Sequence, residues 1–136
     1  EMQYMRKWCC LLILTFLLSG CGMQTQESER LKDLDFTVMD LEKVPEELRD
    51  VLEEKKSMPF KVTYEDDGYL YICVGYGEQD TSGYSIAVED LYLTDNAICV
   101  DTELLGPGKG ETTTAAVTCP YIVLKLGYLD KSVVFE

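Results

Sequence analysis

The sequence predicts a mainly β domain, a small antiparallel β-sandwich or partly open barrel with one N-terminal amphipathic helix. Two observations lead to this prediction. From Pro59 onward, short apolar or alternating runs are separated by polar turns, which is typical of strands. A helical period occurs before that point, between residues 41 and 56, and no long one returns after Lys56. Successive strands with one flanking helix are typical of packed antiparallel sheets.

The helix is predicted to open at Val44-Pro45-Glu46. Proline suits the first helical position, acidic residues stabilise the first turn, and Lys55 and Lys56 close the C-terminal end. We expect its apolar face to pack on its own domain. That face consists of Leu41, Val44, Leu48, Val51 and Leu52.

Two hairpins are predicted after the helix. Glu65-Asp66-Asp67-Gly68 forms the turn of the first, with glycine at a position that needs positive φ. Thr94-Asp95-Asn96 forms the turn of the second. The expected strands are 35–38, 60–64, 69–75, 84–93, 97–105, 112–118, 121–126 and 132–135, with a loop at 106–110.

The N-terminal residues predict a bacterial lipoprotein signal. Met5-Arg6-Lys7 is basic, and residues 8–18 are apolar apart from Thr15. This run is shorter than the roughly 20 residues of a spanning helix and fits a signal peptide. Leu18-Ser19-Gly20-Cys21 resembles the lipobox, in which small residues precede a cysteine that receives a diacylglyceryl group. We therefore expect lipidation of Cys21 and anchoring on the extracytoplasmic face of the cell membrane. The alternative is a buried N-terminal helix that contains a cysteine.

These features divide the chain into three parts. We predict a signal peptide over 1–20, the lipidated cysteine and a flexible tether over 21–34, and one β domain over 35–136. The tether is polar and lacks an apolar period, and a coil of this length spans roughly 20 Å. A helix over 27–34 is the alternative, because Leu31 and Leu34 are three residues apart.

Composition argues against several classes of function. The chain has 25 acidic and 12 basic residues, and this charge disfavours nucleic acid and anionic lipid as partners. The acyl chains must then provide the membrane attachment. There is no histidine, which removes the commonest general base and the usual zinc ligand. We expect no enzyme activity, no metal and no cofactor.

Three cysteines remain after the predicted lipid site: Cys73, Cys99 and Cys119. Each lies in an apolar run, where cysteine behaves as a small buried hydrophobic residue. Three buried thiols are the favoured interpretation, and one disulfide with one free thiol is the alternative.

Two glycine-containing loops are the candidate partner-binding segments, at residues 75–84 and 106–110, and Cys119-Pro120-Tyr121 is a third. Simple strand reversal by glycine and proline is the alternative. Tyr76 is expected to be exposed between two glycines, whereas Tyr84 is expected in the core. The candidate binding residues are Tyr76, Thr81, Ser82, Gly83, Pro107 and Tyr121.

Two neighbouring segments resemble the core of the PrcB C-terminal domain family. They are Gly75-Tyr76-Gly77-Glu78-Gln79-Asp80-Thr81-Ser82-Gly83-Tyr84-Ser85-Ile86 and the following Val88-Glu89-Asp90-Leu91-Tyr92. The resemblance continues through residues 102–108 and 119–123 and covers 60–126. Ser82 stands where the family places the first glycine of its Thr-Gly-Gly-Tyr element. Members of this family are often lipoproteins labelled as protease complex subunits.

The resemblance implies a non-enzymatic, lipid-anchored interaction protein that acts as an accessory, stabilising subunit of a secreted or surface protease. A protease inhibitor is the alternative, because three loops follow one another in an order similar to the inhibitory loops of chagasin-like cysteine-protease inhibitors. These loops are Thr81-Ser82-Gly83-Tyr84, a glycine-rich loop and Cys119-Pro120-Tyr121. A lipid-tethered enzyme is a third interpretation, disfavoured by the missing histidine.

Overall fold

The computed structural model describes residues 29–136. The predicted signal peptide, Cys21 and most of the predicted tether therefore lie outside the described residues. Within residues 29–136, no helix has the length and apolar character needed to cross a membrane.

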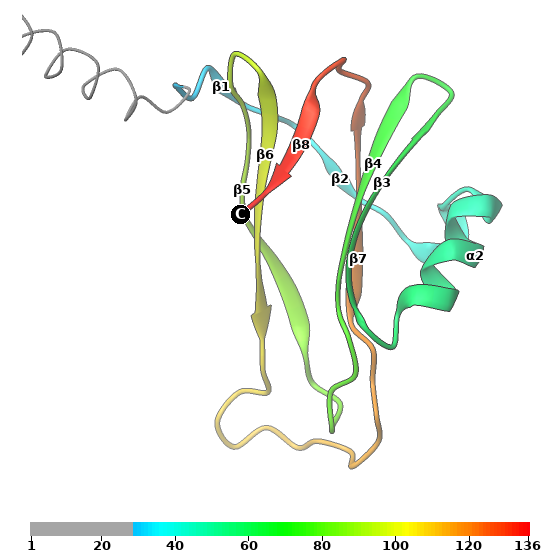
Figure 1. The fold of residues 1–136 in the computed structure, drawn as a ribbon. Helices are drawn as coiled ribbons and strands as arrows, with labels where there is room; N and C mark the ends of the chain where they lie inside the picture. Colours follow the sequence, from blue (N-terminus) through cyan, green and yellow to red (C-terminus); the bar gives the residue numbers. More distant parts are fainter. Residues whose placement is uncertain (1–28) are drawn as a thin grey trace, which may run out of the picture.

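Two four-stranded sheets pack face to face, and a helix covers the outer side of one of them (Figure 1). The first sheet has the order β1 (Lys32–Asp33), β5 (Ser85–Leu93), β6 (Ala97–Leu105), β8 (Ser132–Phe135). The second has the order β2 (Thr37–Val38), β7 (Tyr121–Gly127), β4 (Tyr69–Tyr76), β3 (Pro59–Asp66). Neighbouring strands are antiparallel except for β6 and β8, which are parallel. The predicted mainly β sandwich is confirmed, and its sheets do not close into a barrel.

Both predicted hairpins form. Asp67 and Gly68 link β3 to β4 with φ values of 51° and 79°, as a two-residue turn with positive φ at both positions requires. Thr94 closes the β5–β6 turn, since its backbone N–H donates to the Ala97 carbonyl at 2.8 Å. Its buried hydroxyl also accepts a bond from the Ala97 N–H at 3.1 Å. Local turn chemistry therefore sets the register of both pairs.

Strand β5 contains an irregularity that keeps its apolar side chains on one face. The register with β6 shifts between Val88 and Asp90, so that one extra residue is inserted. Ile86 and Val88 before the shift, and Leu91 and Leu93 after it, all pack on the same core. Without this bulge, strict alternation would turn Leu91 and Leu93 to solvent.

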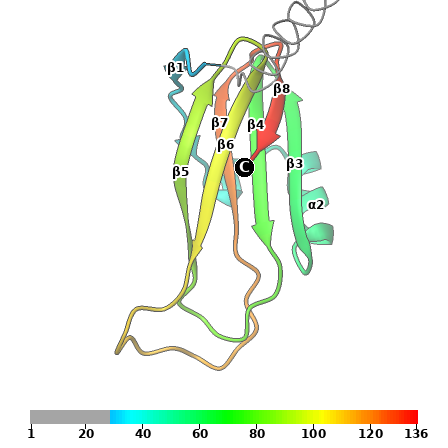
Figure 2. The same cartoon turned by 60° about the vertical axis from the view of Figure 1, so that its left-hand side comes forward.

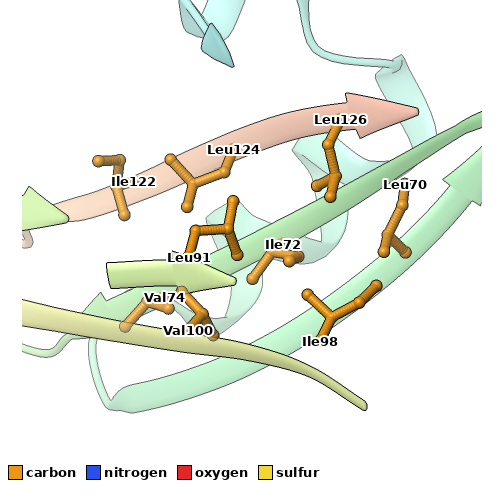
Figure 3. Packing of buried hydrophobic residues seen from close by; sticks show 9 residues of the cluster. All are labelled: Leu70, Ile72, Val74, Leu91, Ile98, Val100, Ile122, Leu124 and Leu126. Carbon is orange, nitrogen blue, oxygen red and sulfur yellow. The ribbon is translucent and has the colours of Figure 1, made fainter. Parts of the chain in front are cut away.

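The main core lies between the two sheets and is formed by β4, β5, β6 and β7 (Figure 3). Strand β4 is buried on both faces. Its Ile72 and Val74 point into the main core, whereas Tyr71 and Cys73 pack beneath the helix. A strand that is covered on both faces has apolar residues at consecutive positions, which explains the continuous apolar run in β4. The main core consists of Leu70, Ile72, Val74, Leu91, Ile98, Val100, Ile122, Leu124 and Leu126.

Helix α2 spans Glu46–Lys55 and follows Pro45, one residue later than the sequence indicates. Leu48 and Leu52 are fully buried against the outer face of the second sheet. Leu41 was expected on the same apolar face, and this expectation is wrong. It belongs to a separate 3₁₀ turn, η1 (Leu41–Lys43), and is exposed because the extended backbone at Val44 interrupts the helical period.

The strand predicted at 112–118 does not form. These residues belong to an exposed connection between β6 and β7, and only Thr118 makes a bridge, to Gln79. Every residue from 112 to 117 is exposed, so this β-prone segment has no core face to bury.

The structured domain begins before the predicted boundary at residue 35. Strand β1 pairs with Tyr92 and Leu93 of β5, so the end of the predicted tether belongs to the first sheet. Arg30 strengthens this attachment. Its Nη2 lies 2.8 Å from Asp90 Oδ1, and its guanidinium lies 4.0 Å from the Tyr92 ring centroid.

The cysteines at 73, 99 and 119 are free thiols in the structure. Cys73 and Cys99 are buried as expected, whereas Cys119 is half-buried. Burial raises the pKa of the Cys73 thiol to about 12, so this group stays protonated and unreactive in the folded protein.

Candidate binding site

Two connections cross between the sheets at one end of the sandwich. Residues 77–84 lead from β4 to β5, and residues 106–120 lead from β6 to β7. Figures 1 and 2 show both connections beyond the same ends of the strands. We call these two segments the loop end.

Hydrogen bonds join the two connections to each other. Gln79 and Thr118 exchange backbone bonds of 2.8 and 3.0 Å, and the Thr118 hydroxyl donates to the Thr81 carbonyl at 2.8 Å. Ser82 N–H donates to the Thr114 carbonyl at 3.0 Å, and Thr114 N–H donates to Ser82 Oγ at 2.8 Å. The loop end is therefore ordered by its own contacts although it contains no regular strand.

Gly83 and Pro107 also bring the two connections close together. Gly83 has a φ of +92°, and a side-chain Cβ there would lie 3.2 Å from the Pro107 ring. A larger residue would strain the backbone and push the connections apart. The structure thus brings together four predicted site residues: Thr81, Ser82, Gly83 and Pro107.

The loop end also exposes an apolar residue that was not predicted as a binding residue. The Val117 side chain is 62% exposed, although it sits between the bridged Thr118 and the bend at Ala116. Leu105, at the end of β6 where this connection starts, is exposed as well. The pattern of residues 112–118 predicts a strand, and for that reason Val117 was not predicted to be an exposed loop residue.

Tyr76 is not the exposed loop residue that the sequence indicated. It is the last residue of β4, its ring packs half-buried on the main core, and its hydroxyl lies 2.6 Å from Thr102 Oγ1 on the other sheet. The reason is strand alternation, which places Tyr76 on the same inward face as Val74. The loop begins only at Gly77, whose φ is 75°.

A cleft opens beside this hydroxyl pair. Strand β8 pairs only with residues 97–100 of β6, so the sandwich is uncovered farther along this side. The cleft has a volume of about 470 Å³ and is lined mainly by apolar side chains, and Tyr76 and Thr102 are among the lining residues. It can accept an apolar side chain of moderate size. The lining residues are Pro59, Phe60, Lys61, Val74, Gly75, Tyr76, Val100, Thr102, Phe135 and Glu136.

Tyr121 directly follows the loop end as the first residue of β7, but its side chain packs on the helix-covered face of the second sheet. Its ring packs on Phe60, with centroids 5.9 Å apart, and its hydroxyl donates to Glu53 Oε1 of α2 at 3.3 Å. Burial and the nearby Glu53 carboxylate raise the pKa of the Tyr121 phenol. Tyr121 therefore serves the helix-covered face of the second sheet, and it is not grouped with Thr81 and Pro107.

Tyr84 was expected in the core, but it is half-buried and belongs to neither core cluster. Its ring lies near Gly106, where an added Cβ would be 3.5 Å from Tyr84 Cε1. The Tyr84 ring therefore packs against the start of the connection from β6 to β7, at Gly106.

Among residues 29–136, no three acidic or cysteine side chains gather in a way that could hold a metal ion.

Residues 70–127 match the family model described as PrcB C-terminal. This match confirms the resemblance to the PrcB C-terminal family that residues 75–92 indicate. The PrcB match runs from β4 to β7 and contains the whole loop end, whereas α2, β3 and β8 lie outside it. Neither a curated protein nor a solved structure shows significant similarity to the chain.

Replacing Tyr76 by Phe should lower the free energy of unfolding by about 1–2 kcal/mol, because it removes a part-buried hydrogen bond between the sheets. Urea unfolding would measure the change. Thr102→Val should cost a similar amount, and the double variant should cost clearly less than the sum of the two. Strictly additive losses would mean that the two hydroxyls do not stabilise the sandwich as a pair.

Proposed function

We propose that this protein is a non-enzymatic accessory subunit of a cell-surface protease complex. The observation that supports this proposal best is the PrcB C-terminal match over residues 70–127, since that family is of the subunit type. The proposal includes a membrane anchor, a diacylglyceryl group on Cys21, inferred from the basic, apolar and small-residue order of residues 5–21.

The loop end is the surface that we propose for the protease. It lies entirely within the matched segment, and the two connections are already ordered by mutual hydrogen bonds. A surface that is ordered before binding loses little conformational entropy on association. Val117 provides an exposed apolar side chain that a partner can bury.

Val117→Glu should weaken capture of the protease by at least about tenfold, because a buried charge at a contact centre costs more than 1.4 kcal/mol. The fold should be unaffected, since Val117 is largely exposed. The measurement is recovery of the protease, identified by mass spectrometry, after cross-linking and pull-down from native membranes.

Val134→Glu is the matched control. Val134 is 46% exposed but lies on β8, outside the matched segment, and its variant should capture the protease like the wild type. Equal capture by the Val117 variant would exclude the loop end as the contact. Recovery of no protease from either the wild type or the control would contradict the proposed function itself. Inhibition of a papain-like protease by the purified protein would instead support the chagasin-like alternative.

A further inference from the structure

Strand β3 forms a long, regular edge of the second sheet. It pairs with β4 over its full length, from Pro59 opposite Tyr76 to Asp66 opposite Tyr69, with no bulge. Within residues 29–136, no strand pairs with its other side. Proteins usually blunt such edges by bulges, short strands, covering segments, proline or charged side chains. Here the single proline of the strand stands at its first residue, so the rest of the edge is available for pairing.

The free backbone groups of this edge belong to alternate residues. A two-residue turn makes Asp66 and Tyr69 a hydrogen-bonded pair, so the groups of Asp66, Tyr64 and Val62 are directed toward β4. The N–H and C=O groups of Lys61, Thr63 and Glu65 consequently point away from the sheet. An additional antiparallel strand would bond to these three residues.

The side chains at the edge leave room for such a strand. Lys61, Thr63 and Glu65 are exposed, and they share the face opposite to the helix. On the other face, α2 packs over Phe60, Val62 and Tyr64 of β3 together with the buried Tyr71, Cys73 and Val123. The helix therefore covers one face of β3, and the face that carries Lys61, Thr63 and Glu65 stays exposed.

We propose that β3 pairs antiparallel with β3 of a second copy of this chain, about a two-fold axis at Thr63. In this register Lys61 lies opposite Glu65 of the partner subunit, and the same pair recurs on the other side of the axis. Thr63 faces Thr63 of the partner subunit, and Val62 faces Tyr64 of the partner subunit. Opposite-charge, Thr–Thr and aromatic–β-branched cross-strand pairs are all stabilising.

Charge selects this register over its neighbours. Shifts that centre the axis on Lys61 or Glu65 place like charges directly opposite each other, which destabilises a strand pair. An axis at Val62 brings Lys61 opposite Thr63 and Glu65 opposite Pro59. An axis at Tyr64 brings Glu65 opposite Thr63, and its single opposite-charge partner for Lys61 is Asp67, which lies in the turn with a φ of 51° and not in the strand. The axis at Thr63 makes both charged residues complementary, which is significant for a chain with a net charge of −13 that otherwise repels its own copies.

A cysteine at the axis tests the proposal in the full-length lipoprotein in native membranes. Thr63→Cys would place two thiols on residues whose Cα atoms are about 5.5 Å apart in a hydrogen-bonded antiparallel pair. This separation suits a disulfide. The half-buried Cys119 is first changed to Ser, and mild oxidation should then give a band of twice the monomer mass on a non-reducing gel. Thr37→Cys, exposed on β2 at the opposite edge of the same sheet, should give no such band.

Charge swaps test whether the disulfide-linked dimer forms through the proposed register. In the Thr63→Cys protein, Lys61→Glu or Glu65→Lys alone should reduce the dimer band to the level of Thr37→Cys. The double swap Lys61→Glu/Glu65→Lys should restore it, and all of these residues are exposed, so the fold should be retained. The proposal is overturned if Thr63→Cys gives no dimer, if it cross-links to a different protein, or if the double swap does not restore the band. This edge lies outside the PrcB match, so its failure would leave the proposed protease contact untouched.

Discussion

Cys21→Ala should release the protein from the membrane fraction and abolish incorporation of labelled palmitate. The physical reason is that the acyl chains are the only attachment we infer. Each buried CH₂ contributes about 0.8 kcal/mol, whereas a chain with a net charge of −13 is repelled by anionic lipid. Fractionation followed by immunoblotting measures the result.

Cys119→Ser is the control for this experiment, because it also removes one cysteine but leaves the lipobox intact. That variant should remain in the membrane fraction and carry labelled palmitate like the wild type. A Cys21→Ala protein that stays with membranes and still incorporates palmitate would show that the lipoprotein interpretation of residues 5–21 is wrong.

Ile72→Ala should have the largest effect on stability, lowering the free energy of unfolding by about 3–5 kcal/mol. Ile72 is 0% exposed and lies in β4, between β3 and β7 and opposite the first sheet. Because strands hold β4 on both sides and α2 covers its other face, the surroundings cannot collapse into the cavity. A small domain has only about 5–15 kcal/mol of stability, so this variant should be close to unfolding.

Urea unfolding monitored by circular dichroism measures the change. Val134→Ala is the control, since its half-exposed side chain on β8 should cost only about 0.5 kcal/mol or less. A loss below about 1 kcal/mol for Ile72→Ala would mean that β4 is less rigidly enclosed than the packing of the main core indicates.

The proposed protease contact and the proposed self-pairing use different parts of the molecule. The loop end lies within the PrcB match, whereas β3 is outside it and forms an edge of the second sheet. A two-fold pair built on β3 would leave the loop connections of each copy free of the strand contact. One assembly could therefore carry two protease-binding surfaces, and the Val117 and Lys61–Glu65 variants would affect them separately.

The candidate site was only partly predictable. Thr81, Ser82, Gly83 and Pro107 were placed in loops because glycine, proline and short polar residues mark loops, and the structure places them in the connections between strands. Tyr76 and Tyr121 were assigned to the same surface, although the structure turns one ring between the sheets and the other toward α2. Alternation shows that neighbouring strand residues point to opposite faces, but it does not show what each face meets.

By itself, the sequence determined the features that depend on nearby residues. Asp67-Gly68 and Thr94-Asp95-Asn96 specify turns, and the spacing of Leu48 and Leu52 specifies the buried face of α2. Tertiary structure alone decided which strands became neighbours outside the two hairpins. The parallel pairing of β8 with β6, the docking of β1 on β5 and the irregular course of residues 112–117 all depend on distant partners. A β-strand forms only where another strand accepts its hydrogen bonds, and no local pattern contains that information.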